Sequence, residues 1–402
     1  MCGILGLSGD YTVFFDEEHD SNIKFKEKFR DALTLLEHRG PDAMGEKLFF
    51  DDNVYIGHTR LAIQDLSSAG TQPMASDNKK LFITYNGEIY NFPILKKNLV
   101  DLGYSFSSTT DTEVILYLYE EYGLDCFQML DGIFSLAIYD KKKEIVVVAR
   151  DGLGIKPLYY YNNKNSFVFG SEIKAILELT GNKNLSLDQK SINRYLTFQW
   201  CPGEGTPFQE IKKHNPGELL VIKNGEIINR KTFFELPITK PIKKSSHLKV
   251  DEIILGLDAN LRKAVHDQMI SDAPLGAFLS GGLDSTSIVA FAKEIDPNIT
   301  CFTIDAQSSA NSISKEDDLP FAKAAADYLN VPLEIIKVDP DSIVRNLEKM
   351  VWMLDEPLGD PAPLNVLYIS ELAKKNDIKV LLSGAGGDDI LTGYRRHQAI
   401  LY

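Results

Sequence analysis

Cysteine is scarce in this sequence, and its four residues, Cys2, Cys126, Cys201 and Cys301, lie far apart with no C-x-x-C pair. This number and spacing exclude a disulfide scaffold and the common zinc motifs. No apolar run approaches the roughly 18 residues of a membrane-spanning helix, and no basic segment followed by an apolar one opens the chain. We therefore expect a cytoplasmic protein with no membrane partner.

Positive charge is also in deficit, since 43 Lys and Arg stand against 57 Asp and Glu and the net charge is −14. A surface that binds nucleic acid needs clustered Lys and Arg, so we expect no nucleic-acid partner and favour small-molecule chemistry. The 402 residues exceed the usual size of a single core, which predicts roughly two domains.

A glycine-rich turn at residues 279–285 (LSGGLDS) lies between an apolar run and a predicted helix that continues to Lys293. Gly281 and Gly282 let the backbone approach an anion, and the helix N-terminus offers unpaired N–H donors and the positive end of its dipole. Asp284 is placed to hold Mg²⁺ against phosphates. Because no Lys follows the glycines, this is not the loop of γ-phosphate transfer, and it predicts a pyrophosphate-binding loop instead.

Strands alternate with helices through the second half, which predicts a parallel α/β sheet with ligands at the carboxyl ends of its strands. The last predicted strand, Lys379–Leu382, ends in a second glycine-rich loop at residues 383–389 (SGAGGDD). Both glycine-rich loops therefore follow strands in the same way. We expect them to form one nucleotide site.

Short alternating apolar runs in the first half predict mostly antiparallel strands. They cover residues 47–50, 54–57, 81–85, 133–139, 145–150 and 167–170. A helix is predicted from Lys24 to Glu37, and two more begin after caps at Asp111 and Ser171. One more hairpin, with Asn224-Gly225 as its turn, precedes a Pro- and Lys-rich stretch. The expected domains are residues 1–235 and 251–402, joined by a linker at 236–250.

Cys2 stands next to the initiator methionine. Removal of Met1 would give Cys2 a free α-amine, whose usual pKa of about 7.7–8.0 suits a general base for the thiol of the same residue. The alternative is a small buried hydrophobe at the start of a strand, and position alone weighs the two about evenly.

Three polar signals lie between the predicted strands of the first half. Arg60 interrupts an apolar stretch, where a guanidinium suits a bidentate clamp on a carboxylate. Asn86-Gly87 is a strong hairpin signal, yet the amide of Asn86 and the N–H of Gly87 would also suit an oxyanion hole. Asp111 suits an α-ammonium group, although alone it is more often a helix cap.

Five motifs together resemble the class II glutamine amidotransferase domain of glutamine-dependent asparagine synthetases: residues 1–4 (MCGI), 38–42 (HRGPD), 86–91 (NGEIYN), 111–115 (DTEVI) and 150–159 (RDGLGIKPLY). The resemblance implies that Cys2 attacks the side-chain amide of glutamine, while Asn86 and Gly87 stabilise the oxyanion. It also implies that Arg60 binds the glutamine carboxylate and Glu88 and Asp111 its ammonium group. The implied glutamine-binding residues are Arg60, Leu61, Ile63, Asn86, Glu88 and Asp111. The implied fold is an αββα sandwich of two antiparallel sheets, of the N-terminal nucleophile type.

The second half resembles the synthetase domain of the same family, an ATP pyrophosphatase fold, at residues 280–285, 355–357 (DEP) and 383–388. The implied chemistry joins an acceptor carboxylate to AMP with release of pyrophosphate, and ammonia from the Cys2 site, arriving through an apolar channel, displaces AMP. The implied partners are therefore glutamine, ATP and an acceptor such as aspartate, with a homodimer left open. The implied ATP-binding residues are Leu279, Ser280, Gly281, Gly282, Asp284, Ser285, Ile304, Ser383 and Gly384, and Mg²⁺ is implied at Asp284 and Asp388.

Two features depart from the family pattern. Ala385 stands at a position where the resemblance to well-studied asparagine synthetases leads us to expect a Glu, placed close to the adenylate. The first hypothesis is an asparagine synthetase, the second is the same chemistry on a uronic acid or another carboxylate in surface-polysaccharide synthesis, and the third is a non-synthetic glutaminase-like or regulatory binding protein. The family's second domain normally continues beyond residue 402, so we expect a C-terminally truncated fragment.

Overall fold

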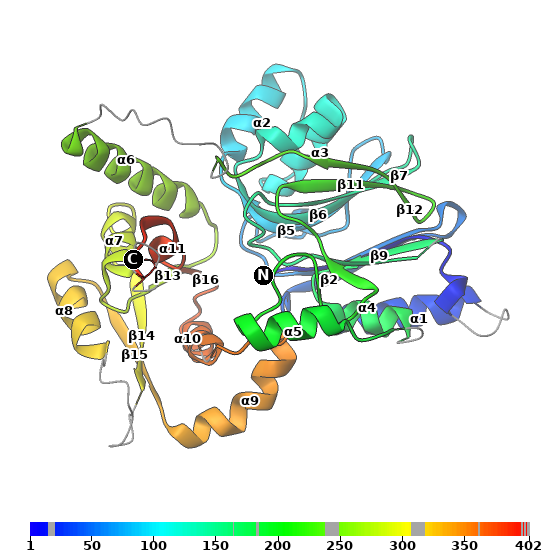
Figure 1. Cartoon of the computed structure of the whole chain (residues 1–402). Coiled ribbons are helices and arrows are strands. Elements are labelled where there is room, and N and C mark those ends of the chain that lie inside the picture. Colours follow the sequence, from blue (N-terminus) through cyan, green and yellow to red (C-terminus); the bar gives the residue numbers. More distant parts are fainter. Residues whose placement is uncertain are drawn as a thin grey trace. The chain divides into compact units, whose positions relative to one another are not determined.

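The computed structural model describes residues 1–14, 21–163, 165–181, 185–237, 249–306, 318–360, 362–394, 397 and 399. The chain forms two compact units (Figure 1), one of Met1–Pro241 with Leu354–Gly359, and the other of Ile242–Met353 with Asp360–Tyr402. Most of the predicted linker, residues 238–248, lies outside the described residues. A short segment from the second half of the sequence, Leu354–Gly359, therefore belongs to the first unit.

The first unit contains two six-stranded sheets in which every strand pair is antiparallel. The first sheet has the order β10 (Ile211–Lys213), β8 (Tyr159–Asn162), β9 (Ser166–Gly170), β1 (Gly3–Gly9), β3 (Val54–Arg60) and β2 (Ala43–Phe49). The second has the order β12 (Glu226–Thr232), β11 (Glu218–Lys223), β7 (Ile145–Arg150), β6 (Gly132–Asp140), β5 (Leu81–Ile89) and β4 (Met74–Ala75). The antiparallel strands predicted for the first half are thereby confirmed.

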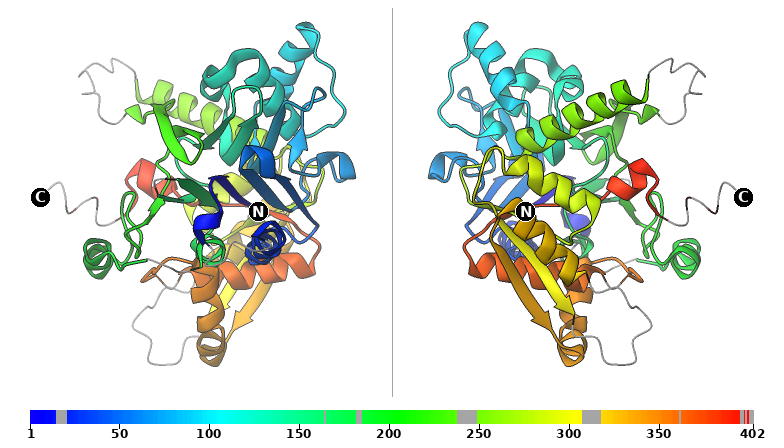
Figure 2. Two further views of the ribbon diagram at one scale, coloured as in Figure 1. Left: turned by 90° about the vertical axis from the view of Figure 1, so that its right-hand side faces the viewer. Right: turned by 90° about the vertical axis from the view of Figure 1, so that its left-hand side faces the viewer.

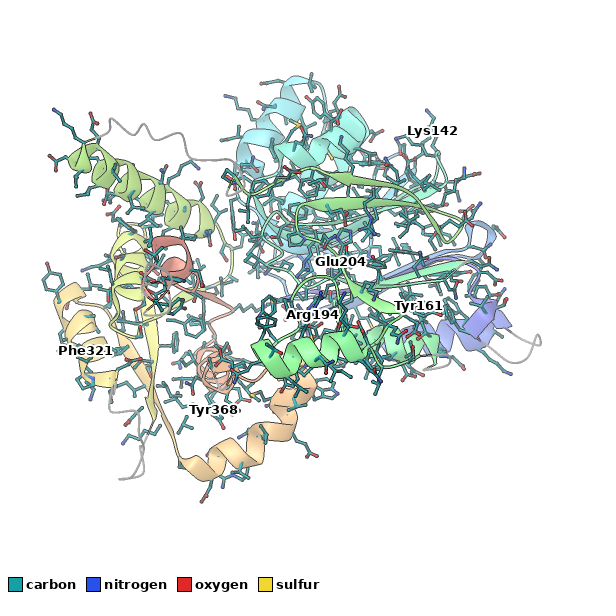
Figure 3. The ribbon with its side chains drawn as sticks, in the orientation of Figure 1. Lys142, Tyr161, Arg194, Glu204, Phe321 and Tyr368 are labelled. Atoms are coloured by element: carbon teal, nitrogen blue, oxygen red, sulfur yellow. The ribbon has the colours of Figure 1, made fainter. Side chains whose placement is uncertain are left out.

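Three apolar layers hold the sheets and the helices of the first unit together, and side chains fill the space between the two sheets (Figure 3). The middle layer joins the inner faces of the sheets through residues such as Ile4, Ile56 and Phe169. Helices α1 (Ser21–Thr34) and α4 (Ile173–Thr180) pack on the first sheet, and α2 (Phe92–Asp101) and α3 (Asp111–Tyr122) pack on the second. Burial of each large apolar side chain contributes about 1.5–3 kcal/mol. This order of layers is the predicted αββα sandwich.

The remaining elements of the first unit are short. They are α5 (Gln189–Phe198) and the 3₁₀ helices η1 (Thr12–Phe14), η2 (Phe50–Asp52), η3 (Ser68–Gly70) and η4 (Gly123–Met129). The turn between β11 and β12 is the predicted Asn-Gly hairpin, because Asn224 and Gly225 both adopt positive φ, at 51° and 82°.

Two of the predicted helix caps are wrong. Helix α3 is capped by Thr110, whose hydroxyl accepts from the Thr112 nitrogen, and Asp111 is instead the first residue of the helix. Ser171 does not cap α4 either, because its hydroxyl accepts from the Ile4 nitrogen in β1. At α3 the neighbouring Thr110 takes the capping role that the local pattern gave to Asp111. At α4 the Ser171 hydroxyl is used by a distant strand and is not available as a cap.

The second unit contains a four-stranded parallel sheet with the order β15 (Leu333–Val338), β14 (Thr300–Ala306), β13 (Leu275–Phe278) and β16 (Val380–Leu382). The right-hand view of Figure 2 shows β14 and β15 side by side. Its helices are α6 (Val250–Gln268), α7 (Leu283–Ala292), α8 (Leu319–Leu329), α9 (Pro340–Leu354), α10 (Ala362–Lys375) and α11 (Gly387–Leu391). Because β13 and β16 are parallel neighbours, the glycine-rich loops that follow them leave the sheet at one edge, as the sequence predicts.

Candidate active sites

The thiol of Cys2 lies immediately before β1, a strand that is buried along its whole length. The Leu61 nitrogen donates to Sγ at 3.3 Å, and the Leu61 carbonyl oxygen lies 3.7 Å from Sγ. Burial raises the pKa of the thiol, so it is protonated at neutral pH and needs a base before it can attack. Burial also lowers the pKa of the Met1 amine to about 5. This end of the chain therefore keeps an amine uncharged and able to accept a proton.

Asn86 and Gly87 lie within β5 rather than in a turn, so the hairpin interpretation of this pair is wrong. The Asn86 side chain is 1% exposed, and its Nδ2 has no hydrogen-bond partner among the described residues. A buried donor without a partner costs about 1–3 kcal/mol, and such a cost is retained mainly where function requires it. A role as hydrogen-bond donor to an oxyanion that forms during the reaction would explain this arrangement physically.

Arg60 ends β3 and is almost fully buried. Its Nη1 donates to the Ser67 carbonyl at 2.6 Å, and its Nη2 donates to the carbonyls of Gln64, at 3.3 Å, and Asp65. Part of the guanidinium fork is thus already used to hold the loop at residues 64–67. The remaining N–H groups and the positive charge suit a single hydrogen bond to a carboxylate rather than the predicted bidentate clamp.

Glu88 and Asp111 form an acidic pair. Asp111 accepts from the Tyr85 hydroxyl at 2.7 Å and from the Ile89 nitrogen at 2.9 Å, and Glu88 accepts from the Gln64 amide. Burial raises the pKa of both carboxyl groups, and the charge of Asp111 raises that of Glu88 further. A cation placed between them would stabilise their charged forms, which is the environment that an ammonium group requires.

All eight residues predicted for the first site line one pocket of about 60 Å³. They are Cys2, Arg60, Leu61, Ile63, Asn86, Gly87, Glu88 and Asp111. The structure adds six polar residues to this lining that the sequence interpretation did not assign, namely Gln64, Gln72, Tyr85, Thr110, Thr112 and Lys156. Lys156 stands within the 150–159 motif, which was the available signal, and burial lowers the pKa of its amine.

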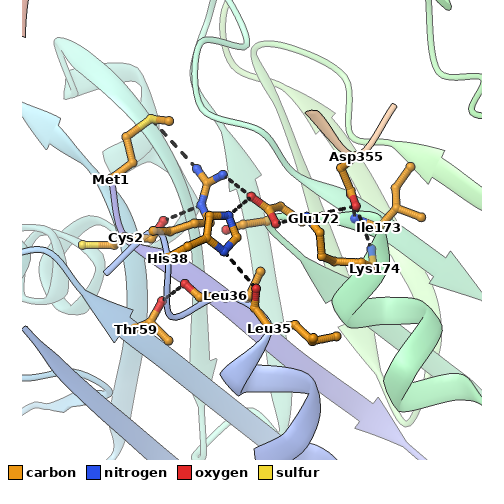
Figure 4. A network of polar contacts seen from close by, with 12 residues as sticks. Met1, Cys2, Leu35, Leu36, His38, Thr59, Glu172, Ile173, Lys174 and Asp355 are labelled. Atoms are coloured by element: carbon orange, nitrogen blue, oxygen red, sulfur yellow. Dashed lines mark hydrogen bonds and ion pairs between the residues drawn. The ribbon is translucent and has the colours of Figure 1, made fainter. Parts of the chain in front are cut away.

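Another unassigned feature is the group of His38, Arg39 and Glu172 (Figure 4), in which Arg39 forms an ion pair with Glu172 and a His38 ring nitrogen lies within hydrogen-bond distance of the same carboxylate. His38 and Arg39 open the 38–42 motif, yet nothing in that motif points to a partner more than a hundred residues away. Arg39 Nε also donates to the Cys2 carbonyl oxygen at 3.0 Å. The group therefore contacts the backbone of the candidate nucleophile.

In the second unit the loop after β13 is closed by its own serines. The hydroxyls of Ser280 and Ser285 lie 3.0 Å apart, and Ser285 Oγ accepts from the Ser280 nitrogen at 3.2 Å. Gly281 has a φ of 80°, and a Cβ there would lie 2.3 Å from the carbonyl carbon of Phe321, a residue labelled in Figure 3. Only glycine fits at this position, and Gly282 then caps helix α7. The amides at this helix start suit an anion such as pyrophosphate.

The loop after β16 packs against the loop after β13. The Asp284 carboxylate lies so close to Gly387 that a Cβ on Gly387 would meet its Oδ2 at 2.2 Å. The Asp388 carboxylate lies against Gly393 in the same way. Among the described residues no group of three or more His, Cys, Asp or Glu is placed to hold a metal ion. Asp284 fits Mg²⁺ only in the manner usual for nucleotide sites, where one or two carboxylates share the ion with phosphate oxygens and water.

A cavity of about 370 Å³ adjoins these loops. Three residues predicted to bind ATP or Mg²⁺, Asp284, Ser383 and Gly384, line it together with Ala385. The other predicted residues do not line it: they are Leu279, Ser280, Gly281, Gly282, Ser285, Ile304 and Asp388. Leu279 is buried and donates through its backbone to Phe302, and Ile304 lies in β14. Most of the cavity wall is apolar and comes from α6, α7 and α11.

Within the described ranges, none of the helices is long and apolar enough to cross a bilayer.

Residues 1–234 match the sequence model of a family described as glutamine amidotransferase domain, and residues 256–402 match that of a family described as asparagine synthase. The chain is similar to glutamine-hydrolyzing asparagine synthetase 1 of Bacillus subtilis (strain 168), with 32% identity over 98% of this chain and 59% of that protein. A Methanocaldococcus jannaschii protein, provisionally named glutamine-hydrolyzing asparagine synthetase 2, is 34% identical over 99% of this chain and 76% of its own length. Amidase chry2 of Gibberella zeae is 29% identical over 93% of this chain and 56% of its own length.

The chain thus spans 59% of the length of the Bacillus protein. The two matched families, and the order in which they follow one another along the sequence, agree with the family resemblance of the sequence motifs. The similarity to the Methanocaldococcus protein extends over three quarters of that relative. The chain belongs to the family of glutamine-hydrolysing asparagine synthetases, with a glutamine amidotransferase region followed by an asparagine synthase region.

Proposed function

We propose that this chain is a glutamine-dependent and ATP-dependent amide ligase, in which the first unit releases ammonia and the second prepares a carboxylate to receive it. The observation that carries the proposal is the pocket of the first unit, whose lining includes the Cys2 thiol, the pair Glu88 and Asp111, and Asn86, whose Nδ2 has no partner in the described part of the chain. A nucleophile, an oxyanion donor and a site for an ammonium group are the parts that glutamine hydrolysis needs.

In the first unit the Cys2 sulfur attacks the side-chain carbonyl carbon of glutamine. The thiol proton passes to the α-amine that removal of Met1 exposes, because a buried thiol with a raised pKa is a weak nucleophile without a base. Asn86 donates to the tetrahedral oxyanion. When the C–N bond breaks, the leaving nitrogen takes the proton from the amine and departs as ammonia. Water then hydrolyses the thioester, which gives glutamate and restores the thiol.

In the second unit the loop at residues 280–285 holds the pyrophosphate part of ATP through its amides, while an oxygen of the acceptor carboxylate attacks the α-phosphorus. Pyrophosphate leaves and an acyl-adenylate forms. Ammonia then attacks the acyl carbon and displaces AMP, which yields the amide. Asp284, with Asp388 as a second candidate, would hold Mg²⁺, which neutralises phosphate charge when bound.

Aspartate is the first acceptor to test, because two of the relatives are named asparagine synthetases. One observation favours a second candidate. Asp284 is the one charged residue among the described residues that line the cavity beside Ala385, so the ammonium group and second carboxylate of aspartate would find few partners there. An acceptor with a single carboxylate and no ammonium group has fewer charges to satisfy at this lining, and uronic acids are one class of such acceptors.

Two experiments test the proposal. The chain is first incubated with glutamine, ATP and Mg²⁺, and pyrophosphate release is measured with aspartate and with a panel of sugar acids and simple monocarboxylates. Amide formation with aspartate supports the first acceptor, and release only with a monocarboxylate supports the second. Glutamate release without ATP consumption under any acceptor would reject the ligase. The second experiment is Cys2→Ala, which should abolish glutamate release and spare synthesis from added ammonia. Glutamine turnover that survives this change would reject the role of the thiol.

A further inference from the structure

The segment Leu354–Gly359 is an unusual part of the first unit, because in the sequence it runs from the last residue of helix α9 towards helix α10, and the rest of both helices belongs to the second unit. Hydrogen bonds and ion pairs hold it. The Asp355 carboxylate accepts from the nitrogens of Ile173 and Lys174, the latter at 3.1 Å. Lys213 Nζ lies 3.2 Å from Glu356 Oε2, and the Gly359 nitrogen donates to the Gln199 carbonyl at 2.7 Å.

Asp355 supplies the cap that helix α4 lacks locally. The residue before the helix, Glu172, makes no side-chain cap bond, and the first two amides of the helix instead bind the Asp355 carboxylate. A carboxylate at this position also meets the positive end of the helix dipole. Asp355 adopts a φ of 66°, which a residue other than glycine keeps only where its surroundings fix it.

From Asp355 a continuous path of charged groups leads to Cys2 (Figure 4). Lys174 Nζ lies 3.2 Å from Asp355 Oδ1 and also contacts Glu172. Glu172 Oε1 lies 2.7 Å from Arg39 Nη1, and Arg39 Nε donates to the Cys2 carbonyl oxygen at 3.0 Å. The side chains of Arg39, Glu172 and Asp355 are each less than a tenth exposed. Water therefore screens these ion pairs little.

The last contact of this path is important for the nucleophile. Once Met1 is removed, Cys2 has a single covalent neighbour, so its orientation depends on contacts of its carbonyl and its sulfur. The carbonyl is held by Arg39 and the sulfur by Leu61. Glu172 in turn fixes the plane of the Arg39 guanidinium, since it accepts from Nη1 while Nε points to the carbonyl.

We propose that Asp355 is a positioning residue for Cys2, acting through Lys174, Glu172 and Arg39, and that the Leu354–Gly359 segment thereby makes the geometry of the nucleophile depend on helices α9 and α10, to which it is covalently joined. The proposal rests on the proposed function of Cys2. A movement of either helix that pulls Asp355 from the start of α4 removes one partner of Lys174, and the remaining charges rearrange around Glu172. Ammonia release in one unit is thereby coupled to the state of the other.

The test uses Asp355→Asn, which keeps the size of the side chain and removes its charge. The matched control is Asp339→Asn. Asp339 also accepts from a helix-start amide, that of Ser342 at 2.8 Å, and lies 3.7 Å from Arg345 Nη2, but it has no path to Cys2. We expect Asp355→Asn to lower kcat for glutamate release about three- to tenfold with little change in KM, because the residues that line the glutamine pocket are untouched. Asp339→Asn should match the wild type.

A double-mutant cycle tests whether the residues act along one path. Asp355→Asn and Glu172→Gln should combine to a loss no larger than that of the stronger single variant. Lys174→Met offers a second route if Asp355→Asn folds poorly, because it leaves the backbone amides of α4 capped by Asp355 and removes only the charged link between Asp355 and Glu172. Equal kcat in Asp355→Asn and Asp339→Asn, or losses that multiply in the double variant, would overturn the proposal.

A readout without turnover separates this proposal from the proposed function. The rate at which iodoacetamide alkylates Cys2, followed by mass spectrometry, reports the orientation and exposure of the sulfur whether or not glutamine is a substrate. Cys126, Cys201 and Cys301 are buried and serve as internal references. A wild type that releases no glutamate would refute the function. An alkylation rate that is the same in Asp355→Asn and Asp339→Asn would refute the positioning role.

Discussion

Replacing Asn86 by alanine separates the catalytic contribution of a buried donor from its cost to the fold. Because Nδ2 has no partner among the described residues and the side chain is 1% exposed, this donor carries a desolvation penalty of about 1–3 kcal/mol in the empty protein. Alanine removes the penalty but also removes a few packed atoms and leaves a small cavity, which costs a similar amount. We therefore expect the free energy of unfolding to change by less than about 1 kcal/mol.

Catalysis should respond much more strongly than stability. Loss of one oxyanion donor typically lowers kcat by about 10²–10³, or about 2.7–4 kcal/mol in the barrier. Glutamate release at saturating glutamine measures kcat, and urea unfolding measures stability. Ser135→Ala is the matched control, because Ser135 lies opposite Asn86 on β6 and also has a buried polar atom without a partner in the described part of the chain, yet it does not line the pocket.

The two variants should therefore agree in stability and differ in activity. Ser135→Ala is expected to keep full kcat. The reasoning would be refuted by an Asn86→Ala protein whose kcat stays within about threefold of the wild type. It would equally be refuted by a destabilisation above about 3 kcal/mol, because the amide would then be a structural partner rather than an unused donor.

Three further outcomes follow from the same structure. Glutamine binding should release protons, because burial raises the pKa values of Glu88 and Asp111 and an ammonium group favours their charged forms. Calorimetry in buffers of different ionisation enthalpy measures the release, and Glu88→Gln should reduce it. Burial opposes the charge of Glu172, but a hydrogen bond from His38 and the charges of Arg39 and Lys174 outweigh it and lower the pKa from 4.5 to about 2. About 3 kcal/mol of stability, present above pH 4.5, should thus be lost as the pH falls towards 2, and the stability difference between the wild type and Glu172→Gln in urea unfolding should shrink over that range. Gly281→Ala should abolish ATP-dependent pyrophosphate release and spare glutamate release, because its Cβ would strike the Phe321 backbone. The first expectation would be contradicted if Glu88→Gln released as many protons as the wild type. The second would be contradicted if the stability difference between the wild type and Glu172→Gln did not change with pH, and the third if Gly281→Ala still released pyrophosphate.

Local signals predicted those parts of the fold whose structure depends on near neighbours. The β11–β12 hairpin follows from Asn224-Gly225, and β7 has the predicted bounds Ile145–Arg150 because its short apolar run is uninterrupted. Helix α5 was missed although Ile192, Tyr195 and Leu196 follow helical spacing, and Ser191 is the one buried residue that the described helix contains. Helix α1 begins at Ser21 rather than Lys24, within the usual scatter of helix ends.

The candidate site divides in a similar way. Cys2, Arg60, Asn86 and Asp111 were singled out because each residue type is unusual in its place, and the structure brings them into one pocket. Lys156 was missed although it stands within the 150–159 motif, because a lysine in a loop gives no local sign that its amine is buried. Partners separated by more than a hundred positions, as in the group of Arg39, Glu172 and Asp355, leave no periodic pattern in a single sequence and become visible only in the folded chain.

The membership of Leu354–Gly359 in the first unit also bears on the order in which the protein is made. A ribosome completes residues 1–237 well before residue 355 emerges, and at about 5–20 residues per second the delay lasts several seconds or more. During that time the start of α4 has no Asp355 to cap it, and Lys174 lacks one of its two acidic partners. The first unit of a nascent chain therefore lacks one contact on the proposed path to Cys2 until residue 355 has been made. If the proposed function holds, such a chain would release ammonia below its full rate until the second unit is being synthesised.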